Sequence, residues 1–448
     1  MFLKRSVQPL LTDFYQFTMA YGYWKSGRQG ERAVFELCFR KNPLGGEFTI
    51  FAGLQDCLSF LSEFQLSRED VQFLRSVLPP ATEEGFFNYL LNISTREVTV
   101  RAVPEGSIVF PQVALLEVEG PLAIVQILET PLLTLANYAS LVATNAARFR
   151  LAAGPDRRLL ELGLRRAQGP DGGISASRYS YIGGFDGTSN VLAGKLYGIP
   201  LFGSVAHSYI TSFTSMSEVK VQEWRAQFLC RGSGPPAAWL PRPGAPAGQR
   251  GPAPAVAGGP THAAGLRRQP NAVDSVGVGT HLVTCPIQPS LGCVYKLTQV
   301  NSEPRMKLTE DEDKMTLPGK KTAYRFFRAD GSPFLDLLTL ASEPVPEAGE
   351  EVWCHVLRPG RGAVPVTATR VELLHHVYYE HGQMSRDAPS TTEIRSYAQD
   401  SLSKLPAQHK RLVEPVPYQV AISMELHRLL SELAQERAPV PEESHCAE

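Results

Sequence analysis

The chain has 448 residues, and its 44 lysines and arginines almost balance its 45 aspartates and glutamates. This length allows a large buried core, held in two domains or in one domain with a sizeable addition. The balanced charge argues against a general nucleic-acid binder and against a protein held on anionic membranes. Seven cysteines at scattered positions, without a C-x-x-C pair, favour a reducing compartment over a disulfide framework or a structural zinc site.

The N-terminus does not resemble a signal peptide, and the most apolar segment does not resemble a membrane-spanning helix. The opening residues MFLKRSVQPLLTDF lack the long apolar core of a signal peptide. Residues 122–142 are apolar, but Gln126, Glu129, Pro131 and Asn137 interrupt them. We therefore expect a soluble protein of the cytosol with no membrane partner.

The first third of the chain predicts helices mixed with strands. Residues 9–26 fit a helix with a broad aromatic face. Residues 35–40 alternate between apolar and polar side chains, which is typical of a half-buried strand. Residues 122–151 have helical periodicity with a predicted interruption at Thr130-Pro131, because proline cannot continue the hydrogen-bond pattern. This portion fits an α+β module that leads into a barrel.

Two apolar runs in the middle of the chain are each followed by charged or polar side chains. Residues 159–164 precede Arg165 and Arg166, and residues 199–206 precede His207. These runs predict buried strands of βα units, whose carboxyl ends bind ligands in parallel sheets and barrels. The arginines and the histidine would then share one anion site. Taken singly, the same residues also fit a surface arginine pair and a core histidine.

Glycine and proline mark the places where this pattern changes. Residues 169–173 and 183–190 predict two turns, the second of which opens a helix at Val191. From Gly232 to Pro270, 26 of 39 residues are glycine, proline or alanine. Such a stretch buries too little apolar surface to offset its ordering entropy, so we expect residues 228–271 to be disordered, with neither a strand nor an amphipathic helix.

The pattern of folded elements returns at residues 276–280, VGVGT. A strand that ends in Gly-x-Gly-Thr can present backbone N–H groups and a hydroxyl to a phosphate, although an ordinary tight turn fits the same four residues. Strands are predicted between residues 294 and 357. Helices are predicted at residues 371–380, 391–404 and 418–435.

Several long motifs occur together in this chain. They are LLTDFYQFTMAYGYW, FELCFRKNPLGGEF, YASLVATNAARFR, LLELGLRRAQGPDGG, GGFDGTSNVLAGKLYGIPLFGSVAHS, VGVGTHLVTCPIQPSLGCVYKL and RMKLTEDEDKMTLPGKKTAYR. In combination they resemble nicotinate phosphoribosyltransferase, a type II phosphoribosyltransferase family of NAD biosynthesis. Residues 228–271 lie outside the resemblance.

The resemblance implies an α/β fold, in which an irregular TIM-like phosphoribosyltransferase barrel joins an α+β sandwich domain built from N- and C-terminal segments. Residues 1–118 and 297–448 would form the sandwich, and residues 119–296 the barrel. The family's barrel strand with the pattern R-L-D-S-G-D has no counterpart in this chain. At roughly 30 residues for each βα unit, at least two units are missing, so the barrel is expected to be incomplete.

The implied reaction joins nicotinate to 5-phosphoribosyl-1-pyrophosphate, giving nicotinate mononucleotide and pyrophosphate, in the Preiss-Handler route to NAD. ATP is the implied co-substrate, which makes the enzyme a ligase as well as a pentosyltransferase. The resemblance also implies Mg²⁺ or Mn²⁺ at the pyrophosphate. No metal ligands are assigned, because the expected acidic strand is absent. The implied assembly is a homodimer with a shared active site.

Four residues match the family positions that handle phosphate. His207 corresponds to the histidine that ATP phosphorylates. Arg165 follows a predicted strand and suits bidentate binding of a phosphate or carboxylate. Backbone amides near Gly279 and Thr280 would take the 5′-phosphate.

Three further residues match the family positions around the pyridine ring. Tyr15 would stack on the ring from across the dimer interface, and Ser204 corresponds to a small hydroxyl residue near the nicotinate. Ser189 stands where the related nicotinamide-using enzymes carry aspartate. A carboxylate there would repel nicotinate, so serine favours the acid as substrate.

Two functions remain open from the sequence. The chain is either an active ATP-coupled transferase or a catalytically inactive truncated isoform that acts only as a dimer partner. A parallel barrel closes only when every strand is present, since an open edge leaves backbone groups unpaired and the core uncovered. We therefore expect this chain to have little transferase activity and reduced stability.

Overall fold

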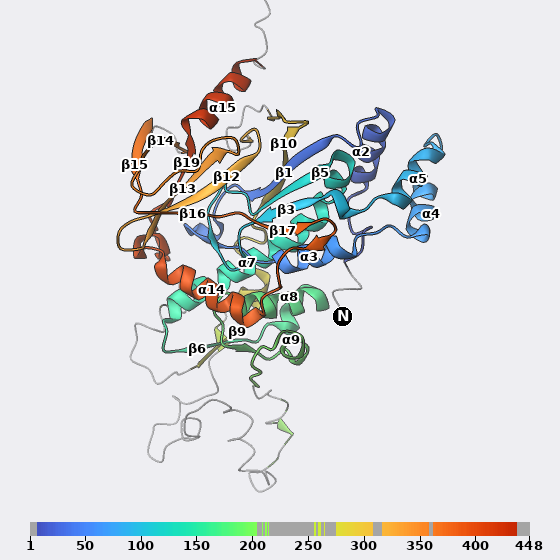
Figure 1. The fold of residues 1–448 in the computed structure, drawn as a ribbon. Coiled ribbons are helices and arrows are strands. Elements are labelled where there is room, and N and C mark those ends of the chain that lie inside the picture. The colour runs from blue at the N-terminus through green and yellow to red at the C-terminus, as the bar shows by residue number, and fades with distance from the viewer. Residues whose placement is uncertain are drawn as a thin grey trace, which may run out of the picture.

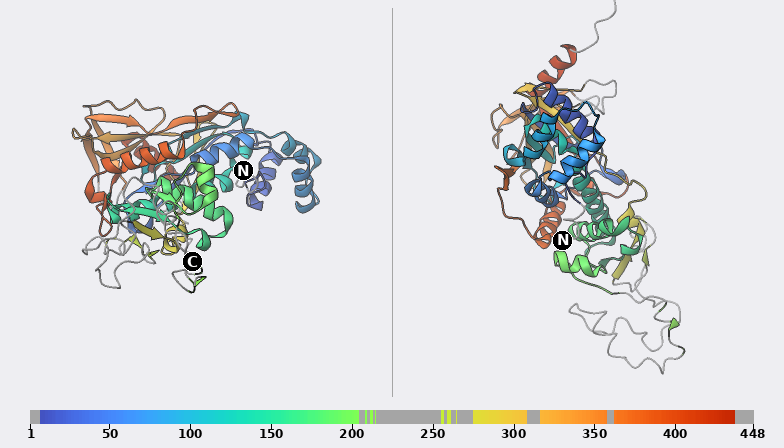
Figure 2. Two further views of the ribbon diagram at one scale, coloured as in Figure 1. Left: turned by 90° about the horizontal axis from the view of Figure 1, so that it is seen from below. Right: turned by 90° about the vertical axis from the view of Figure 1, so that its right-hand side faces the viewer.

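The computed structural model describes residues 7–203, 275–307, 316–357 and 362–436, with a few isolated positions between 208 and 264. Two large, mainly antiparallel sheets form one side of the molecule (Figure 1). A small parallel sheet lies on the other side, and helices separate it from the large sheets. Both Figure 1 and the right-hand view of Figure 2 show this order of layers. The central helices are α7 (Glu129–Ala153), α8 (Gly169–Ile182) and α14 (Thr391–Lys404).

The first large sheet has seven strands and combines distant parts of the chain. In spatial order its strands are β11 (Glu303–Pro304), β10 (Cys293–Val300), β1 (Arg32–Phe39), β5 (Leu116–Pro121), β3 (Thr99–Ala102), β17 (His376–Glu380) and β18 (Gln383–Met384). All neighbouring strands are antiparallel. Strands from residues 32–121 are therefore paired on both sides with strands that follow residue 292.

The second large sheet has six strands, all from the last third of the chain. Its order is β15 (Ala363–Thr367), β14 (Glu351–Val356), β19 (Gln419–Ser423), β13 (Pro333–Leu340), β12 (Lys321–Phe327) and β16 (Arg370–Leu373). Only the pair of β13 and β19 is parallel in this sheet. Strands β2 (Thr49–Ile50) and β4 (Ile108–Val109) form a separate two-stranded sheet.

Strand β1 was expected to be half-buried, yet almost all of it is buried. Its polar face lies against other protein groups, because Glu36 forms an ion pair with Lys321 of β12 at 3.1 Å. Both side chains are less than one-tenth exposed. The alternation of polar and apolar residues in β1 thus reflects a buried ion pair on one face and apolar core on the other.

The helices before the parallel sheet follow the predicted pattern with shifted ends. Helix α2 (Phe14–Lys25) begins later than the predicted residue 9. It is followed by α3 (Leu54–Glu63), α4 (Arg68–Val77) and α5 (Glu84–Asn92). The long helical segment is divided at Leu128, between α6 (Leu122–Ile127) and α7, rather than at Pro131. Pro131 lies in the first turn of α7, where its missing N–H has no intrahelical acceptor to lose.

The parallel sheet has the order β7 (Gly187–Thr188), β6 (Arg158–Glu161), β9 (Ser275–Val278) and β8 (Ala255–Val256). Helix α8 connects β6 with β7 and packs on α7. The two helices approach closely at Gly183, where an added Cβ atom would lie 2.3 Å from the carbonyl oxygen of Ala143. Short helices α9 (Val191–Tyr197) and α13 (Thr280–Thr284) follow β7 and β9.

Two expectations about this region are wrong. Residues 169–173 are not a turn but the first residues of α8, with Pro170 in the first turn of the helix, where proline is favoured. Residues 228–271 were expected to contain no strand, yet Ala255 and Val256 form β8 and pair with Gly277 and Val278 of β9. The disorder expected for the remainder of that segment lies outside the described residues.

The C-terminal predictions are correct for one helix and wrong for two segments. Helix α14 has the predicted bounds, and a capping box between Ser390 and Glu393 begins it. The predicted helix at 371–380 is instead β16 followed by β17. The first five residues of the segment 419–436 form β19, and α15 (Met424–Glu436) follows. Sheet pairing with β12, β3 and β13 overrides the local helical periodicity in both places.

Glu119 on β5 is the centre of an ion-pair network that joins the two large sheets. Its carboxylate accepts hydrogen bonds from Lys320 at 2.6 Å, from Arg32 at 2.9 Å and from Arg101 at 3.2 Å. Partial burial alone would raise the pKa of Glu119, but the hydrogen bonds and charges of Lys320 and Arg32 lower it to about 2.

We expect Glu119 to contribute to the acid stability of the fold. A lowered pKa stabilises the folded state above the unfolded-state pKa of about 4.5, and this contribution is lost as the pH falls from there toward 2. With allowance for solvent screening, the loss is about 2 kcal/mol. Urea unfolding of the wild type and of Glu119→Gln between pH 6 and pH 3 measures it, with Glu372→Gln at an exposed pair as control. Parallel stability curves for the wild type and Glu119→Gln would contradict the assignment.

Candidate active site

The carboxyl ends of three parallel strands lie at one edge of the small sheet. Glu161 at the end of β6 is in register with Thr188 at the end of β7 and with Val278 at the end of β9. Hydrogen bonds continue past the strand ends, from the Leu162 N–H to the Val278 carbonyl at 2.8 Å and from the Ser189 N–H to the Glu161 carbonyl at 2.9 Å. The loops after β6, β7 and β9 therefore start side by side.

These three loops carry four of the residues singled out in the sequence. Arg165 lies in a 3-10 turn (Leu164–Arg166) after β6, and its side chain is exposed. Ser189 is half-buried directly after β7. Gly279 precedes α13, and Thr280 is its exposed first residue. The edge thus combines a guanidinium, two hydroxyls and the backbone N–H groups at the start of a helix, all of which bind anions.

Close packing fixes α13 beside the loop that carries Arg165. An added Cβ atom at Gly163 would lie 2.4 Å from a methyl carbon of Val283, so glycine is needed for this approach. Helix α7 holds the other side of α13. Tyr138 donates its hydroxyl hydrogen to the Val283 carbonyl at 2.6 Å, and the Asn145 amide donates to the His281 carbonyl at 3.0 Å.

Glu161 is a buried carboxylate that the sequence analysis did not single out. It is 1% exposed. Its Oε2 atom accepts hydrogen bonds from the Ser177 hydroxyl at 2.8 Å and the Thr188 hydroxyl at 2.5 Å, and its Oε1 atom accepts one from the Gly163 N–H. The signal available in the sequence was an acidic residue inside the apolar run LLELGL, since a carboxylate is rarely buried without partners.

The remaining predicted residues are not gathered at this edge in the described chain. His207 and Ser204 lie outside the described residues. The segment that leads to them runs beside β7, where Leu201 pairs in parallel with Thr188. Tyr15 lies on α2, which packs on α6 instead of on the parallel sheet. The residue is 46% exposed, and the pKa of its hydroxyl is raised by partial burial and by the nearby Glu129.

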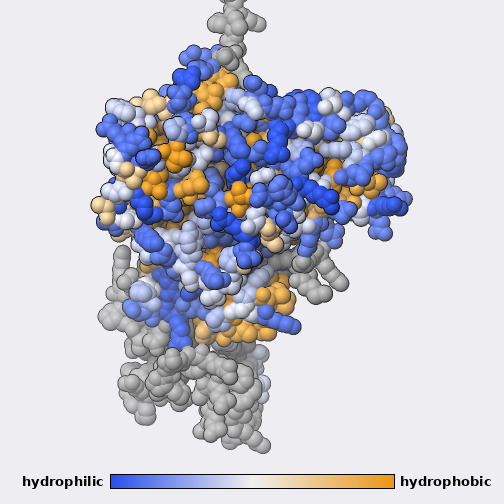
Figure 3. All heavy atoms as spheres, in the orientation of Figure 1, coloured by the Kyte–Doolittle hydropathy of each residue, from blue (hydrophilic) through white to orange (hydrophobic). Residues whose placement is uncertain are grey.

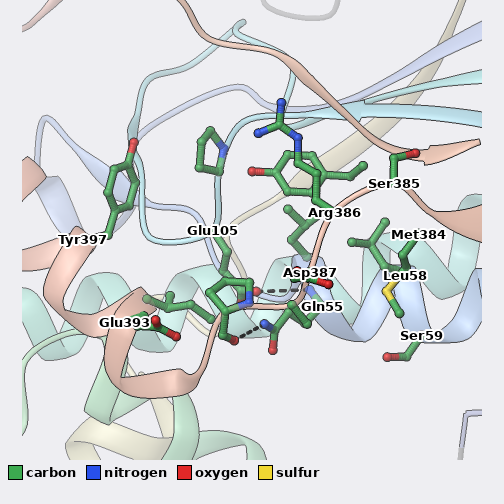
Figure 4. A pocket seen from close by; sticks show the side chains of 16 residues that line it. Gln55, Leu58, Ser59, Glu105, Met384, Ser385, Arg386, Asp387, Glu393 and Tyr397 are labelled. Atoms are coloured by element: carbon green, nitrogen blue, oxygen red, sulfur yellow. Dashed lines mark hydrogen bonds between the residues drawn. The ribbon is translucent and has the colours of Figure 1, made fainter.

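A separate cavity of about 980 Å³ lies between α3, the β17–β18 hairpin and the start of α14 (Figure 4). Its lining includes Gln55, Glu105, Arg386, Glu393 and Tyr397. Glu105 accepts hydrogen bonds from the backbone N–H groups of Gly53 and Gln55, so its carboxylate holds the start of α3. None of the predicted site residues lines this cavity.

Two further features are absent from the described residues. No three His, Cys, Asp or Glu side chains among them are grouped as ligands of a metal ion. None of the helices in the described ranges combines the length and the hydropathy needed to cross a bilayer. The fold and the polar strand ends together define an α/β protein of the class that binds ligands at the carboxyl ends of parallel strands.

Comparison with known proteins identifies the family. The nicotinate phosphoribosyltransferase N-terminal domain matches residues 10–137, and the C-terminal domain of the same family matches residues 320–430. Nicotinate phosphoribosyltransferase of Bos taurus is 44% identical, with 96% of this chain and 97% of the relative covered. The Homo sapiens enzyme is 43% identical, with 97% and 98% covered.

Solved structures agree with this match. The crystal structure of human nicotinic acid phosphoribosyltransferase covers 95% of this chain and 100% of its own, with a TM-score of 0.77 and 39% identity. A nicotinate-nucleotide pyrophosphorylase from Pyrococcus furiosus shares the fold at 18% identity, with a TM-score of 0.58 and 88% and 94% coverage. The chain belongs to the nicotinate phosphoribosyltransferase family and has the activity for which that family is named, in the biosynthesis of NAD.

The alignment also measures what this chain lacks. About 430 of its 448 residues take part in the 528-position alignment with the bovine enzyme, so about 98 positions of that alignment have no residue of this chain. These positions amount to about three times the roughly 30 residues of one βα unit.

Replacing Ser189 by aspartate is expected to weaken the binding of nicotinate. A carboxylate at the end of β7 would repel the carboxylate of nicotinate, with an expected loss of about 10-fold in affinity for nicotinate relative to nicotinamide. Competition between the two bases in isothermal titration calorimetry measures the ratio. Ser189→Asn is the matched control, because it adds similar volume without charge. An unchanged ratio in Ser189→Asp would remove Ser189 from base selection.

Proposed function

We propose that this chain transfers the phosphoribosyl group to nicotinate at the carboxyl edge of the parallel sheet, in a reaction coupled to ATP. The observation that carries the proposal is the meeting of the loops after β6, β7 and β9, which bring Arg165, Ser189 and Gly279-Thr280 to one edge. Each of these groups suits one part of the two anionic substrates.

The chemistry needs orientation more than proton transfer. The pyridine nitrogen of nicotinate carries a lone pair at neutral pH and attacks the anomeric carbon, while the bond from that carbon to pyrophosphate breaks. No general base is required. The site must hold the two anions in line and stabilise the departing pyrophosphate. In this proposal Arg165 binds an anionic group, Thr280 and the Gly279 backbone hold the 5′-phosphate, and Ser189 with Ser204 surrounds the nicotinate.

The proposed energy coupling uses ATP and His207. A phosphorylated imidazole adds negative charge and acceptor oxygens beside the ribose and pyrophosphate. Mg²⁺ or Mn²⁺ would accompany the phosphates. The described part of this edge does not fit a protein-held metal, because both oxygens of Glu161 already accept hydrogen bonds. No step is therefore assigned to the metal.

We also propose a domain arrangement and an assembly. Strands β6, β7 and β9 belong to an incomplete, TIM-like barrel of residues 119–296, and residues 1–118 and 297–448 form the sandwich. The pairing of β1 with β10 and of β3 with β17 supports the sandwich. The exposed apolar face of α2 around Tyr15, with Phe14 50% exposed, supports a homodimer in which Tyr15 reaches the partner's site. The proposed location is the cytosol.

The second candidate function is that of a subunit with low activity that serves mainly as a dimer partner. The roughly 98 alignment positions without residues of this chain favour it. So does an exposed apolar surface over α9, where Val191 is 70% exposed and Leu192 41% exposed. Figure 3 shows apolar side chains gathered in this part of the molecule. A barrel with all its strands would be expected to use such apolar residues as core or interface.

Incubation with γ-labelled ATP is expected to place a phosphoryl group on His207. The label should be labile in acid and stable in base, as phosphohistidine is, and it should disappear in His207→Ala. His427→Ala, on the C-terminal helix α15, is the control and should keep the label. Label that persists in His207→Ala would rule out the assignment.

The activity of the chain as it stands is expected to be low. A variant in which residues 228–271 are replaced by the corresponding barrel segment of the bovine relative should form nicotinate mononucleotide about 100-fold faster or more, since a single missing charge-stabilising group costs that much. Release of nicotinate mononucleotide, followed by chromatography, measures both rates. Rates that are similar in the two proteins and readily measurable in both would exclude the low-activity subunit.

A further inference from the structure

Glu161 at the strand edge contacts the loop after β6, α8 and the end of β7, all of which belong to the proposed site. It ends β6, and its carboxylate is buried at 1% exposure. A buried carboxylate is costly unless hydrogen bonds compensate for the lost water. Here three donors compensate it, and they come from the loop after β6, from α8 and from the end of β7.

The bonds to Thr188 and Ser177 continue into the loop that carries Ser189. Thr188 Oγ1 donates to Glu161 and accepts a hydrogen bond from the Asn190 N–H at 2.9 Å. Asn190 also donates its amide hydrogen to Ser177 at 3.1 Å and caps α9 through the Ala193 N–H. Ser189 therefore lies between two residues that both depend on this carboxylate. Its own N–H is bonded to the Glu161 carbonyl.

The bond to Gly163 determines the course of the loop that carries Arg165. Gly163 starts the turn that contains Arg165, and the Arg166 N–H donates to the Gly163 carbonyl at 2.8 Å. Gly163 also packs against Val283 of α13, the helix that begins at Thr280 directly after Gly279. One carboxylate thus holds two of the three loops directly and reaches the third through the contact at Gly163.

We infer that Glu161 is a positioning residue of the transferase, which sets the relative placement of the nicotinate loop and the phosphate loops. It acts through Gly163, Thr188 and Ser177, since its oxygens are already occupied by them and it does not bind substrate itself. Its contribution is hydrogen-bond acceptance and not negative charge. This inference rests on the proposed site at the strand edge.

Two substitutions separate these roles. Glu161→Ala leaves the Gly163 N–H and two hydroxyls without an acceptor, so both loops are released. Glu161→Gln can still accept from Gly163 through its amide oxygen and can donate its amide hydrogens to the Ser177 and Thr188 hydroxyls. Those hydroxyls can turn to other acceptors, because Ser177 lies 2.9 Å from the Gly173 carbonyl and Thr188 lies 3.4 Å from Ser177.

The test measures the binding of nicotinate and of 5-phosphoribosyl-1-pyrophosphate to the full chain by calorimetry, together with the thermal unfolding midpoint. Glu161→Ala is expected to weaken both ligands by about 10-fold or more at a temperature where it remains folded. The affinities of Glu161→Gln are expected to stay within about 3-fold of those of the wild type. A change in affinity of about 3-fold corresponds to less free energy than a typical hydrogen bond contributes. Binding, unlike the unfolding midpoint, is insensitive to a general loss of stability while the protein is folded.

Glu36→Ala is the matched control. Glu36 is also a buried carboxylate, 6% exposed, and it is also paired, with Lys321 at 3.1 Å, but it lies on β1 of the first large sheet. This variant is expected to lower the unfolding midpoint without changing either affinity.

The possible outcomes have distinct meanings. If the wild type binds both ligands and Glu161→Ala binds them with the same affinities, the positioning role is overturned and the proposed site remains in place. Equal losses in Glu161→Gln and Glu161→Ala would also overturn it, because the charge of Glu161 would then be the contribution. Failure of the wild-type chain to bind either ligand would overturn the proposed site and the positioning role together.

Discussion

The ion pair between the buried Arg178 and the partly exposed Asp56 fixes α8, the helix that connects β6 with β7 of the parallel sheet, against α3. Arg178 on α8 is 3% exposed, and one of its terminal nitrogens donates to both carboxylate oxygens of Asp56 on α3 at 2.9 Å. Its other terminal nitrogen donates to Gln55 at 2.7 Å. Removing one partner of such a pair typically costs about 3–5 kcal/mol, because it leaves a buried charge uncompensated.

The neighbouring residue on α8 connects this pair to the strand edge. Ser177 donates to Glu161, while Arg178, one position later, points to the other side of the helix. A shift of α8 relative to α3 would therefore displace the hydrogen bonds that hold the loops after β6 and β7. Helices α3, α7 and α14 supply the frame against which α8 is positioned. Coupling of this kind explains how residues outside the site can affect its geometry.

Much of the fold could be predicted from local signals, and the errors have a common cause. Helix α14 has the predicted bounds, and the structure shows that a Ser390–Glu393 capping box begins it. Residues 376–380 and 419–423 show helical spacing of apolar residues, but each pairs with a strand from a distant part of the chain. Periodicity within a short window cannot report such partners. Pro131 was predicted to interrupt a helix, but the structure shows that α7 starts at Glu129, so the proline lies in its first turn.

The site was predictable to a similar degree. Strand-end reasoning predicted that Arg165 and Arg166 share an anion site with His207, which lies outside the described residues. Ser189, Gly279 and Thr280 were singled out by the family resemblance, and the structure brings them to the same edge as Arg165. Strand-end reasoning could not single out Glu161, whose role depends on partners that lie up to 27 positions away in the chain. Tyr15 is a different case, because its proposed role depends on a second subunit and not on its own chain.

The central claim is that the substrates bind where the three strand ends meet. Hydrogen–deuterium exchange of the full chain, with and without 5-phosphoribosyl-1-pyrophosphate, tests it most directly. The account predicts slower exchange in residues 162–166, 189–190 and 279–283 when the ligand is present, with no change around the cavity near Glu105. Protection confined to that cavity, or no protection in any of the three loops at saturating ligand, would contradict it.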